Sequence, residues 1–171
     1  AILKVARFGY DGKGQATVNN REEALIAFGH FKGEHCVLEQ RLTLDYEVSV
    51  VLARDEQGRV ACFPTGENLH TKGILDVSIV PARTTGCVRS DAEDVAARIA
   101  EKLGYIGTMG VEFFVSRGQL IVNEMAPRPH NSGHWTIEGC TTNQFRELAR
   151  YLLGMPLEEP RLVAPTVMKN I

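Results

Sequence analysis

Two glutamates in the second half of the chain have the residue type and the spacing to bind a divalent cation. Glu112 lies in the apolar run Val111–Val115, and Glu124 follows the apolar run Leu120–Val122. Ser116-Arg117-Gly118-Gln119 separates the two runs, and short β-branched and aromatic runs around a glycine-containing turn predict a β-hairpin. Mg²⁺ is usually held by one or two carboxylates together with phosphate oxygens and water.

The register of this hairpin decides whether the two carboxylates meet. If the turn is centred on Gly118, Glu112 lies opposite Glu124 and both side chains point to one face. A two-residue loop at Arg117-Gly118 would instead pair Glu112 with Asn123 and send Glu124 to the other face. Like charges opposite each other are destabilising unless a cation compensates, so the first register favours a metal site. The alternative is that one glutamate is simply solvated on the outer face.

The segment after the hairpin carries groups suited to a small polar anion. Residues 126–134 read APRPHNSGH, and two prolines with a glycine exclude a regular helix. This also argues against His130 and His134 as a zinc pair on a helix. Arg128 and His130, directly after a strand with a carboxylate, therefore predict an anion site and favour the metal at the hairpin.

The start of the chain offers candidate phosphate contacts. A strand is expected at Ile2–Ala6, followed by the loop Gly9-Tyr10-Asp11-Gly12-Lys13-Gly14-Gln15. Its glycines allow backbone N–H groups to approach a ligand closely. The loop is not a P-loop, because Gly14 follows Lys13 and no helix comes at once, so a mobile hairpin turn is the alternative. Lys4, inside a short apolar strand, either contacts a ligand or protects a sheet edge.

Strands and helices must position these residues. Strands are expected at about 35–40, 46–53, 59–63 and 74–81, and residues 64–73, which include His70, are expected to be irregular. One helix is expected from the cap Asn20 with its capping-box partner Glu23, and a second from the capping box Ser90-x-x-Glu93. A third is expected at about Asn143–Leu153. Taken singly, Glu39, Glu47 and His70 are better explained as solvated surface residues than as ligand contacts.

Composition bounds the class of protein. The 171 residues are 44% hydrophobic and 23% charged, with a formal net charge of −2, which suits one domain or a sizeable piece of a larger protein. No basic footprint for nucleic acid and no apolar run of about 18 residues are present, so neither nucleic acid nor membrane is an expected partner. Four scattered cysteines suggest a reduced, cytoplasmic protein. Both ends fall in apolar runs, and we expect an excised fragment.

Several motifs together resemble a known family. The segments are GYDGKGQ, EQRL with Glu47 eight residues after Glu39, then His70, VEFFV and VNEMAPRPHNSGH. They are similar to the ATP-grasp domain of the 5-(carboxyamino)imidazole ribonucleotide synthases, ligases of purine biosynthesis once called the ATPase subunit of phosphoribosylaminoimidazole carboxylase. The resemblance runs from Lys4 to about Met168. NEMAPRPHNSGHWT is specific to these synthases, whereas the glycine loop and the acid pair indicate only ATP-grasp.

The resemblance implies an α+β ATP-grasp fold, with an antiparallel sheet, helices packed on one face and a small α+β lid. Residues 1–33 would belong to the lid with its glycine loop, and residues 34–171 to the rest of the nucleotide-binding region. A preceding α/β domain and a following β-rich domain would lie outside the chain.

The resemblance also implies residue roles. Lys4 and the loop Gly9, Tyr10, Asp11, Gly12, Lys13, Gly14 and Gln15 would cover the ATP phosphates. The hinge facing adenine would be Glu39, Gln40, Arg41 and Leu42, although Arg41 departs from its usual apolar form. Glu47 would hold the ribose hydroxyls, and His70 would lie against the nucleotide. Glu112 and Glu124 would hold Mg²⁺, or Mn²⁺ in its place, with Asn123 beside them. Arg128 and His130 would meet bicarbonate or carboxyphosphate and the amine of the imidazole nucleotide.

The implied reaction joins bicarbonate to the exocyclic amine of aminoimidazole ribonucleotide with consumption of ATP, in a full-length protein that is expected to be a homodimer. Two alternatives stay open. The chain could belong to another ATP-grasp ligase, such as a biotin-dependent carboxylase or a formate-dependent transformylase, from which residues 126–136 would distinguish it. It could also be a nucleotide-binding module without turnover.

Overall fold

The computed structural model describes residues 1–7 and 13–171, so Gly9, Tyr10, Asp11 and Gly12 of the glycine loop lie outside the described residues. The described chain divides into two compact units. The smaller unit comprises Ala1–Thr43 with Thr71–Ile74, and the larger comprises Leu44–His70 with Leu75–Ile171. No helix among the described residues is long and apolar enough to cross a membrane.

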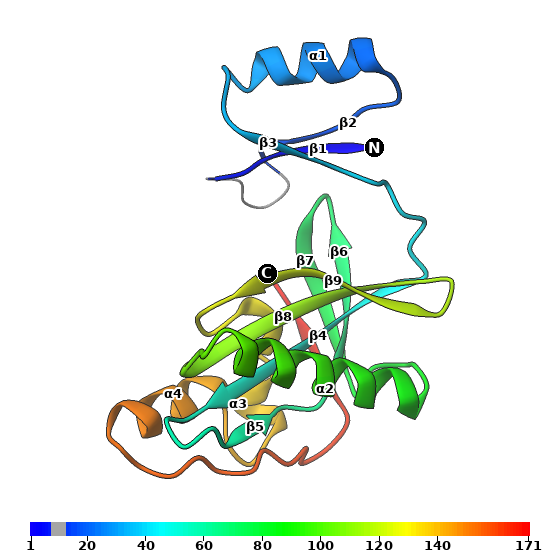
Figure 1. The fold of residues 1–171 in the computed structure, drawn as a ribbon. Coiled ribbons are helices and arrows are strands. Elements are labelled where there is room, and N and C mark those ends of the chain that lie inside the picture. Colours follow the sequence, from blue (N-terminus) through cyan, green and yellow to red (C-terminus); the bar gives the residue numbers. More distant parts are fainter. Residues whose placement is uncertain (8–12) are drawn as a thin grey trace. The chain divides into compact units, whose positions relative to one another are not determined.

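The smaller unit is a three-stranded sheet with one helix (Figure 1). Its elements are β1 (Ile2–Val5), β2 (Gln15–Thr17), α1 (Arg21–His30) and β3 (Cys36–Glu39), and the strand order is β2-β1-β3. Leu3, Val18 and Ala27 form its core. The cap of α1 is as expected, because Asn20 accepts a hydrogen bond from the Glu23 N–H at 2.9 Å. Strand pairing groups β3 with this unit, whereas the sequence-based division placed it with residues 34–171; the lid assignment itself stays a prediction.

The larger unit is built on a seven-stranded sheet (Figure 1). The order is β10-β7-β6-β4-β8-β9, and β5 also pairs with β4. The strands are β4 (Tyr46–Arg54), β5 (Val60–Cys62), β6 (Gly66–Thr71), β7 (Ile74–Val80), β8 (Gly107–Ser116), β9 (Gln119–Ala126) and β10 (Thr166–Lys169). The helices are α2 (Gly86–Lys102), the 3₁₀ turn η1 (Asn131–Gly133), α3 (Thr136–Gly139) and α4 (Gln144–Leu152).

Helices cover both faces of this sheet, not one face as the resemblance implied (Figure 1). On the first face α2 packs on alternate residues of the central strands, such as Val50 of β4 and Val111 of β8. On the second face Val51 contacts the cluster around Trp135, next to α3. The Thr108 hydroxyl on β8 donates to the Gln144 carbonyl of α4 at 3.3 Å. The second face carries the polar residues considered below.

Two expectations about local structure were wrong. Residues 66–71 form strand β6 instead of an irregular segment, because Lys72 and Gly73 both adopt positive φ and turn the chain tightly back into β7. The helix expected to start at Ser90 begins at Gly86, and Thr85 caps it. Glu93, the supposed capping-box partner, instead accepts hydrogen bonds from the Thr65 N–H at 3.1 Å and the Thr65 hydroxyl at 3.0 Å.

Candidate functional site

The hairpin of β8 and β9 brings Glu112 opposite Glu124. Its turn is the two-residue loop at Arg117-Gly118, with φ of 52° and 72°, and Ser116 pairs with Gln119. A regular ladder from this turn would pair Glu112 with Asn123. The register instead shifts between Glu112 and Phe113, which pairs with Val122, so Asn123 is an extra residue that forms a β-bulge. The bulge restores the pairing of the two carboxylates on one face.

Glu112 is a buried carboxylate beside a second one. It is 9% exposed, and burial together with the charge of Glu124 raises its pKa from the ordinary 4.5 to about 7. Among the described residues no group of three or more His, Cys, Asp or Glu side chains is placed to hold a metal ion. Two facing carboxylates still fit a Mg²⁺ ion that takes its remaining ligands from phosphate and water. The observation that supports this fit is that Glu112 is buried opposite a second carboxylate.

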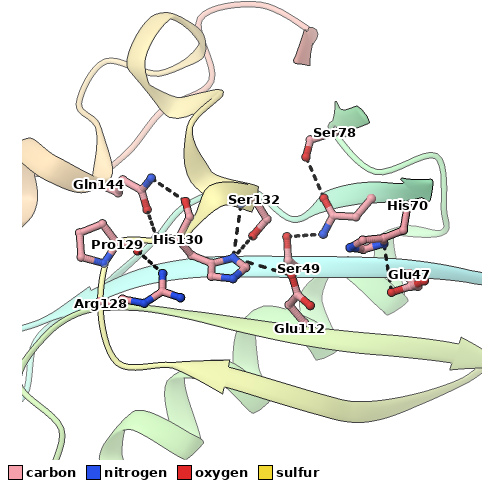
Figure 2. Close-up of polar contacts among 11 residues, drawn as sticks. Glu47, Ser49, His70, Ser78, Glu112, Arg128, Pro129, His130, Ser132 and Gln144 are labelled. Atoms are coloured by element: carbon pink, nitrogen blue, oxygen red, sulfur yellow. Dashed lines mark hydrogen bonds and ion pairs between the residues drawn. The ribbon is translucent and has the colours of Figure 1, made fainter. Parts of the chain in front are cut away.

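Glu47 and His70 lie on the same face, on neighbouring strands (Figure 2). His70 Nδ1 is 3.3 Å from Glu47 Oε2. The neighbouring Glu47 carboxylate raises the pKa of the imidazole, and the charges of Glu112 and Glu124 act in the same direction. This part of the site therefore joins a histidine with a raised pKa to three carboxylates, which can accept hydrogen bonds from nucleotide hydroxyl groups and would meet phosphates only through a bound cation.

A buried polar chain supports the strands next to these residues (Figure 2). The Asn68 side-chain amide donates to Ser49 Oγ at 2.8 Å, and the Ser78 hydroxyl donates to Asn68 Oδ1 at 2.9 Å. Ser49 pairs with Glu112 across β4 and β8. These hydrogen bonds thus link β7, β6 and β4 beside Glu112. They were not foreseen from the sequence.

His130 is held at both its backbone and its ring (Figure 2). Its N–H donates to Gln144 Oε1 at 2.8 Å, and its carbonyl accepts from Gln144 Nε2 at 2.8 Å. Its Nδ1 lies 2.8 Å from Ser132 Oγ and accepts from the Ser132 N–H at 3.3 Å. Because Nδ1 accepts a hydrogen bond from the Ser132 N–H, the neutral ring carries its hydrogen on Nε2.

The ring of His130 lies beside the acidic pair without forming an ion pair. Its Nδ1 is 3.7 Å from Glu112 Oε1. Burial, followed by the positive charge of Arg128, lowers the pKa of His130 to about 4. Since the pKa of Glu112 is also raised, the contact joins a neutral imidazole to a carboxyl group at neutral pH. Such an imidazole can donate a hydrogen bond to an anion without carrying charge.

Arg128 is exposed, and its Nη1 donates to the Pro129 carbonyl at 3.0 Å. The segment Pro127–Pro129 is irregular, as its prolines predict, and His130 has extended backbone, so His130 and His134 do not form a helical zinc pair. Arg128 therefore lies just after the end of β9, two positions before His130, and its guanidinium is accessible to solvent. This arrangement suits a mobile cation that meets an anionic substrate.

In the smaller unit the candidate residues have the following places. Lys4 on β1 forms a 2.7 Å ion pair with Glu39 on β3. Lys13 and Gly14 precede β2, which begins at Gln15, and Gly14 has a φ of 76°. Gln40, Arg41 and Leu42 follow β3 in irregular backbone. The Lys4–Glu39 pair gives Lys4 a partner that the sequence did not suggest.

In the larger unit the structure brings Glu47, His70, Glu112, Glu124 and His130 to one face of the sheet. Residues that the sequence did not single out, namely Ser49, Asn68, Ser78, Ser132 and Gln144, connect or support them. A signal existed only for Gln144, which directly follows the helix cap Asn143. The others are small polar residues in strands or turns, which are common on any protein surface.

In sequence order, a small sheet-and-helix unit is followed by an antiparallel sheet with an acidic hairpin. This is the organisation of an ATP-grasp domain. The ATP-grasp domain family matches residues 1–145, and the chain belongs to this family. It is 42% identical over 174 residues to N5-carboxyaminoimidazole ribonucleotide synthase of Bacillus subtilis. The alignment covers 100% of this chain and 45% of that protein.

Solved structures agree with this relationship. The Staphylococcus aureus N5-carboxyaminoimidazole synthetase complexed with ADP has a TM-score of 0.92 and 39% identity, over 99% of this chain and 46% of that chain. The Aspergillus clavatus N5-carboxyaminoimidazole synthase in complex with ADP and 5-aminoimidazole ribonucleotide has a TM-score of 0.89 and 27% identity, over 99% and 45%. The chain spans about half the length of the curated relatives it matches. The expected ATP-grasp α+β fold and the resemblance to these synthases are confirmed.

Proposed function

We propose that the full-length protein carrying this sequence is an ATP-dependent carbon–nitrogen ligase that carboxylates the exocyclic amine of aminoimidazole ribonucleotide. Its similarity to synthases solved with ADP, and in one case with aminoimidazole ribonucleotide, supports this substrate set. The observation that carries the proposal is the facing pair Glu112 and Glu124 with His130 Nδ1 3.7 Å from Glu112. Acidic ligands and an anion-binding imidazole are thereby joined on one face.

The proposed reaction balances as follows. A bicarbonate oxygen attacks the γ-phosphorus of ATP, the bond to the β-phosphate oxygen breaks, and ADP and carboxyphosphate result. Carboxyphosphate breaks down to CO₂ and phosphate, and the exocyclic amine attacks CO₂ and loses a proton to give the carboxyamino product. Phosphoryl transfer asks the protein mainly for positioning and charge compensation.

The residues of the larger unit take these tasks. Glu112 and Glu124, with Asn123 beside them, would hold Mg²⁺ or Mn²⁺, which would supply charge compensation for the phosphates. Glu47 would accept the ribose hydroxyls, and His70 would lie against the nucleotide. His130 Nε2 and the Arg128 guanidinium would donate hydrogen bonds to bicarbonate and to carboxyphosphate.

In the smaller unit Lys4 and residues 9–15 are proposed to contact phosphates, and Glu39 to Leu42 to contact adenine. A cytoplasmic, homodimeric full-length protein is also part of the proposal. These assignments follow from the resemblance. The ion pair with Glu39 holds the Lys4 side chain next to β3.

The proposal is tested by ADP release from the full-length protein, measured with and without bicarbonate and aminoimidazole ribonucleotide. We expect release to require bicarbonate and to match the carboxylated product in amount. Nucleotide binding without ADP release would favour a binding module. ADP release that depends on formate or biotin would favour another ATP-grasp ligase.

A second test separates anion binding from nucleotide binding. Arg128→Ala removes an exposed guanidinium that the sheet does not need for packing, so we expect a larger loss of bicarbonate-dependent turnover than of ADP affinity. Steady-state kinetics with varied bicarbonate and ADP titration by calorimetry provide the comparison. Equal losses in both measurements would contradict the assigned role, and Arg161→Ala, another exposed arginine, is the control.

A further inference from the structure

Gln144 is fully buried, and both hydrogen bonds of its side chain lead to His130 of the candidate site. Its amide bonds both backbone groups of His130, fourteen positions earlier, at 2.8 Å each (Figure 2). Its own N–H donates to the Thr136 hydroxyl at 3.3 Å, and its carbonyl accepts from the Thr108 hydroxyl at 3.3 Å. Each polar group of this residue is therefore occupied, and it ties α4, β8 and the segment before η1 together.

His130 depends on this contact because its own neighbourhood offers little backbone bonding. Pro127 and Pro129 have no N–H to donate, and residues 127–130 have no strand or helix pairing. The His130 carbonyl also accepts from the Gly133 N–H at 3.0 Å. The Gln144 amide adds a second donor to this carbonyl and supplies the acceptor for the His130 N–H, and it thereby ties the backbone from which the imidazole projects to α4.

Two glycines allow His130 and Gln144 to sit this close to the sheet. A Cβ at Gly110 would lie 2.7 Å from His130 Cβ, and one at Gly133 would lie 2.7 Å from Gln144 Oε1. Both distances are too short for real atoms, so the glycines leave the space that these two residues fill. The ring then lies against Gly110 of β8 and Ser132, while the Gln144 amide holds the backbone behind it, so movement of that backbone would carry the ring away from Glu112.

We propose that Gln144 is a positioning residue for the bicarbonate step: by clamping the backbone of His130, it fixes the imidazole beside Glu112 where the anion is bound. This inference rests on the proposed function. Bicarbonate is small and has few atoms to bind, so its placement depends on each fixed donor. Misplacement of a catalytic group by about 1 Å can cost on the order of 100-fold in rate.

The test compares Gln144→Met with Glu147→Met in the full-length protein. Glu147 is also fully buried on α4, and its carboxylate accepts two hydrogen bonds, from the Thr142 hydroxyl at 2.5 Å and the Glu158 N–H at 2.9 Å. Both variants replace a buried polar side chain by one of similar length and remove two hydrogen bonds. Neither Glu147 bond involves His130, so this variant controls for loss of stability alone.

We expect Gln144→Met to raise the KM for bicarbonate by about tenfold or more and to leave the KM for ATP within about twofold of wild type. Glu147→Met is expected to lower the Tm to a similar extent with little change in either KM. Gln144→Glu keeps the shape and the bond from the His130 N–H but loses the bond to the His130 carbonyl, so an intermediate KM is expected. It also provides the test if the methionine variant does not fold. An unchanged bicarbonate KM in folded Gln144 variants would overturn the proposal.

A readout that needs no turnover separates this inference from the proposed function. In protein with ¹⁵N-labelled histidine, the His130 ring signals, assigned by their loss in His130→Asn, are expected to shift or broaden in Gln144→Met but not in Glu147→Met. If wild-type protein releases no bicarbonate-dependent ADP, the proposed function fails while this experiment still tests the clamp. Unchanged His130 signals in Gln144→Met would show that the clamp does not position the ring.

Discussion

Ionisation of Glu112 in the folded protein is unfavourable compared with ionisation of a solvent-exposed carboxyl group. It is buried, it faces Glu124, and its pKa is raised to about 7, mainly by burial and then by the charge of Glu124. Buried carboxylates with a raised pKa beside a second carboxylate are often found at functional sites, and a bound cation would compensate their charge.

Glu112→Gln is expected to stabilise the ligand-free protein at pH 8. The carboxyl has a higher pKa in the folded protein than its ordinary 4.5, so the folded state binds more protons and wild-type stability falls as pH rises from about 4.5 to about 7. The loss in the free energy of unfolding that Glu112 causes over this pH range is at most about 3 kcal/mol.

Thermal unfolding between pH 5 and pH 8 measures this difference. We expect a smaller fall in Tm with pH for Glu112→Gln than for wild type, although His70, whose pKa is also raised, leaves part of the slope in both proteins. Glu56→Gln, in an exposed turn, is the control. A Glu112→Gln protein less stable than wild type at pH 8 would contradict the prediction.

Glu124→Gln is expected to reduce ADP formation by about two orders of magnitude or more, which corresponds to about 3 kcal/mol of transition-state stabilisation. The neutral amide loses the charge that would hold Mg²⁺ opposite Glu112, while the bulged pairing can persist. Single-turnover ADP formation over a range of Mg²⁺ concentrations is the measurement. Near-wild-type turnover would remove the metal role from Glu124, and Glu56→Gln again serves as the control.

At the scale of elements, the hairpin of β8 and β9 combines a tight turn with a bulge. Arg117 and Gly118 both have positive φ, as two-residue hairpin turns of the mirror-image type require, and Asp45 Oδ2 accepts from the Gly118 N–H at 3.1 Å. The turn alone would put the two glutamates on opposite faces. Asn123 adds one residue to β9, and that single insertion decides that the acids meet.

Arg117→Asn is expected to stabilise the protein by about 0.5–1 kcal/mol. Asparagine tolerates the left-handed backbone that Arg117 adopts at a φ of 52°, whereas arginine is strained there. Gly118→Ala, at a φ of 72°, is expected to destabilise by about 1 kcal/mol for the same reason. Urea unfolding of both variants measures the effect, and the same sign of change in both would contradict the assigned turn.

At the scale of the whole larger unit, α2 approaches the sheet through its smallest side chains. Val95, Ile99 and Leu103 recur at helical spacing, but the fully buried residues of α2 are Ala92, Ala96 and Ala100. Val95 and Ile99 flank this stripe, and Leu103 is exposed. The alanine stripe lets the helix lie close to β4 and β8, which keeps the opposite face of those strands in place for the polar site.

Ala96→Leu is expected to destabilise the protein by about 1–3 kcal/mol, because three extra carbons at a fully buried position must push α2 from the sheet. Ala97→Leu, one position along and only half-buried, should cost much less. Equilibrium urea unfolding of the two variants gives the comparison. Equal effects would contradict close packing through the alanine stripe.

The sequence by itself determined features that depend on neighbouring residues. The cap Asn20, a helix starting near Asn143, the breaking of regular structure by Pro127 and Pro129, and the hairpin around Gly118 were all foreseen, because each rests on local backbone geometry. The motifs around Glu124 also placed the chain among the ATP-grasp proteins, and the family match agrees.

Only the tertiary structure decided how the site is assembled. The bulge at Asn123 depends on pairing with β8, the raised pKa of Glu112 depends on what buries it, and the Gln144 contact joins residues fourteen positions apart. The strand β6 was missed because it is rich in polar residues, and Asn68 among them is satisfied by Ser49 and Ser78, which lie on other strands. Hydrogen-bond partners, burial and register are properties of packed neighbours, and a linear pattern of residue types does not contain them.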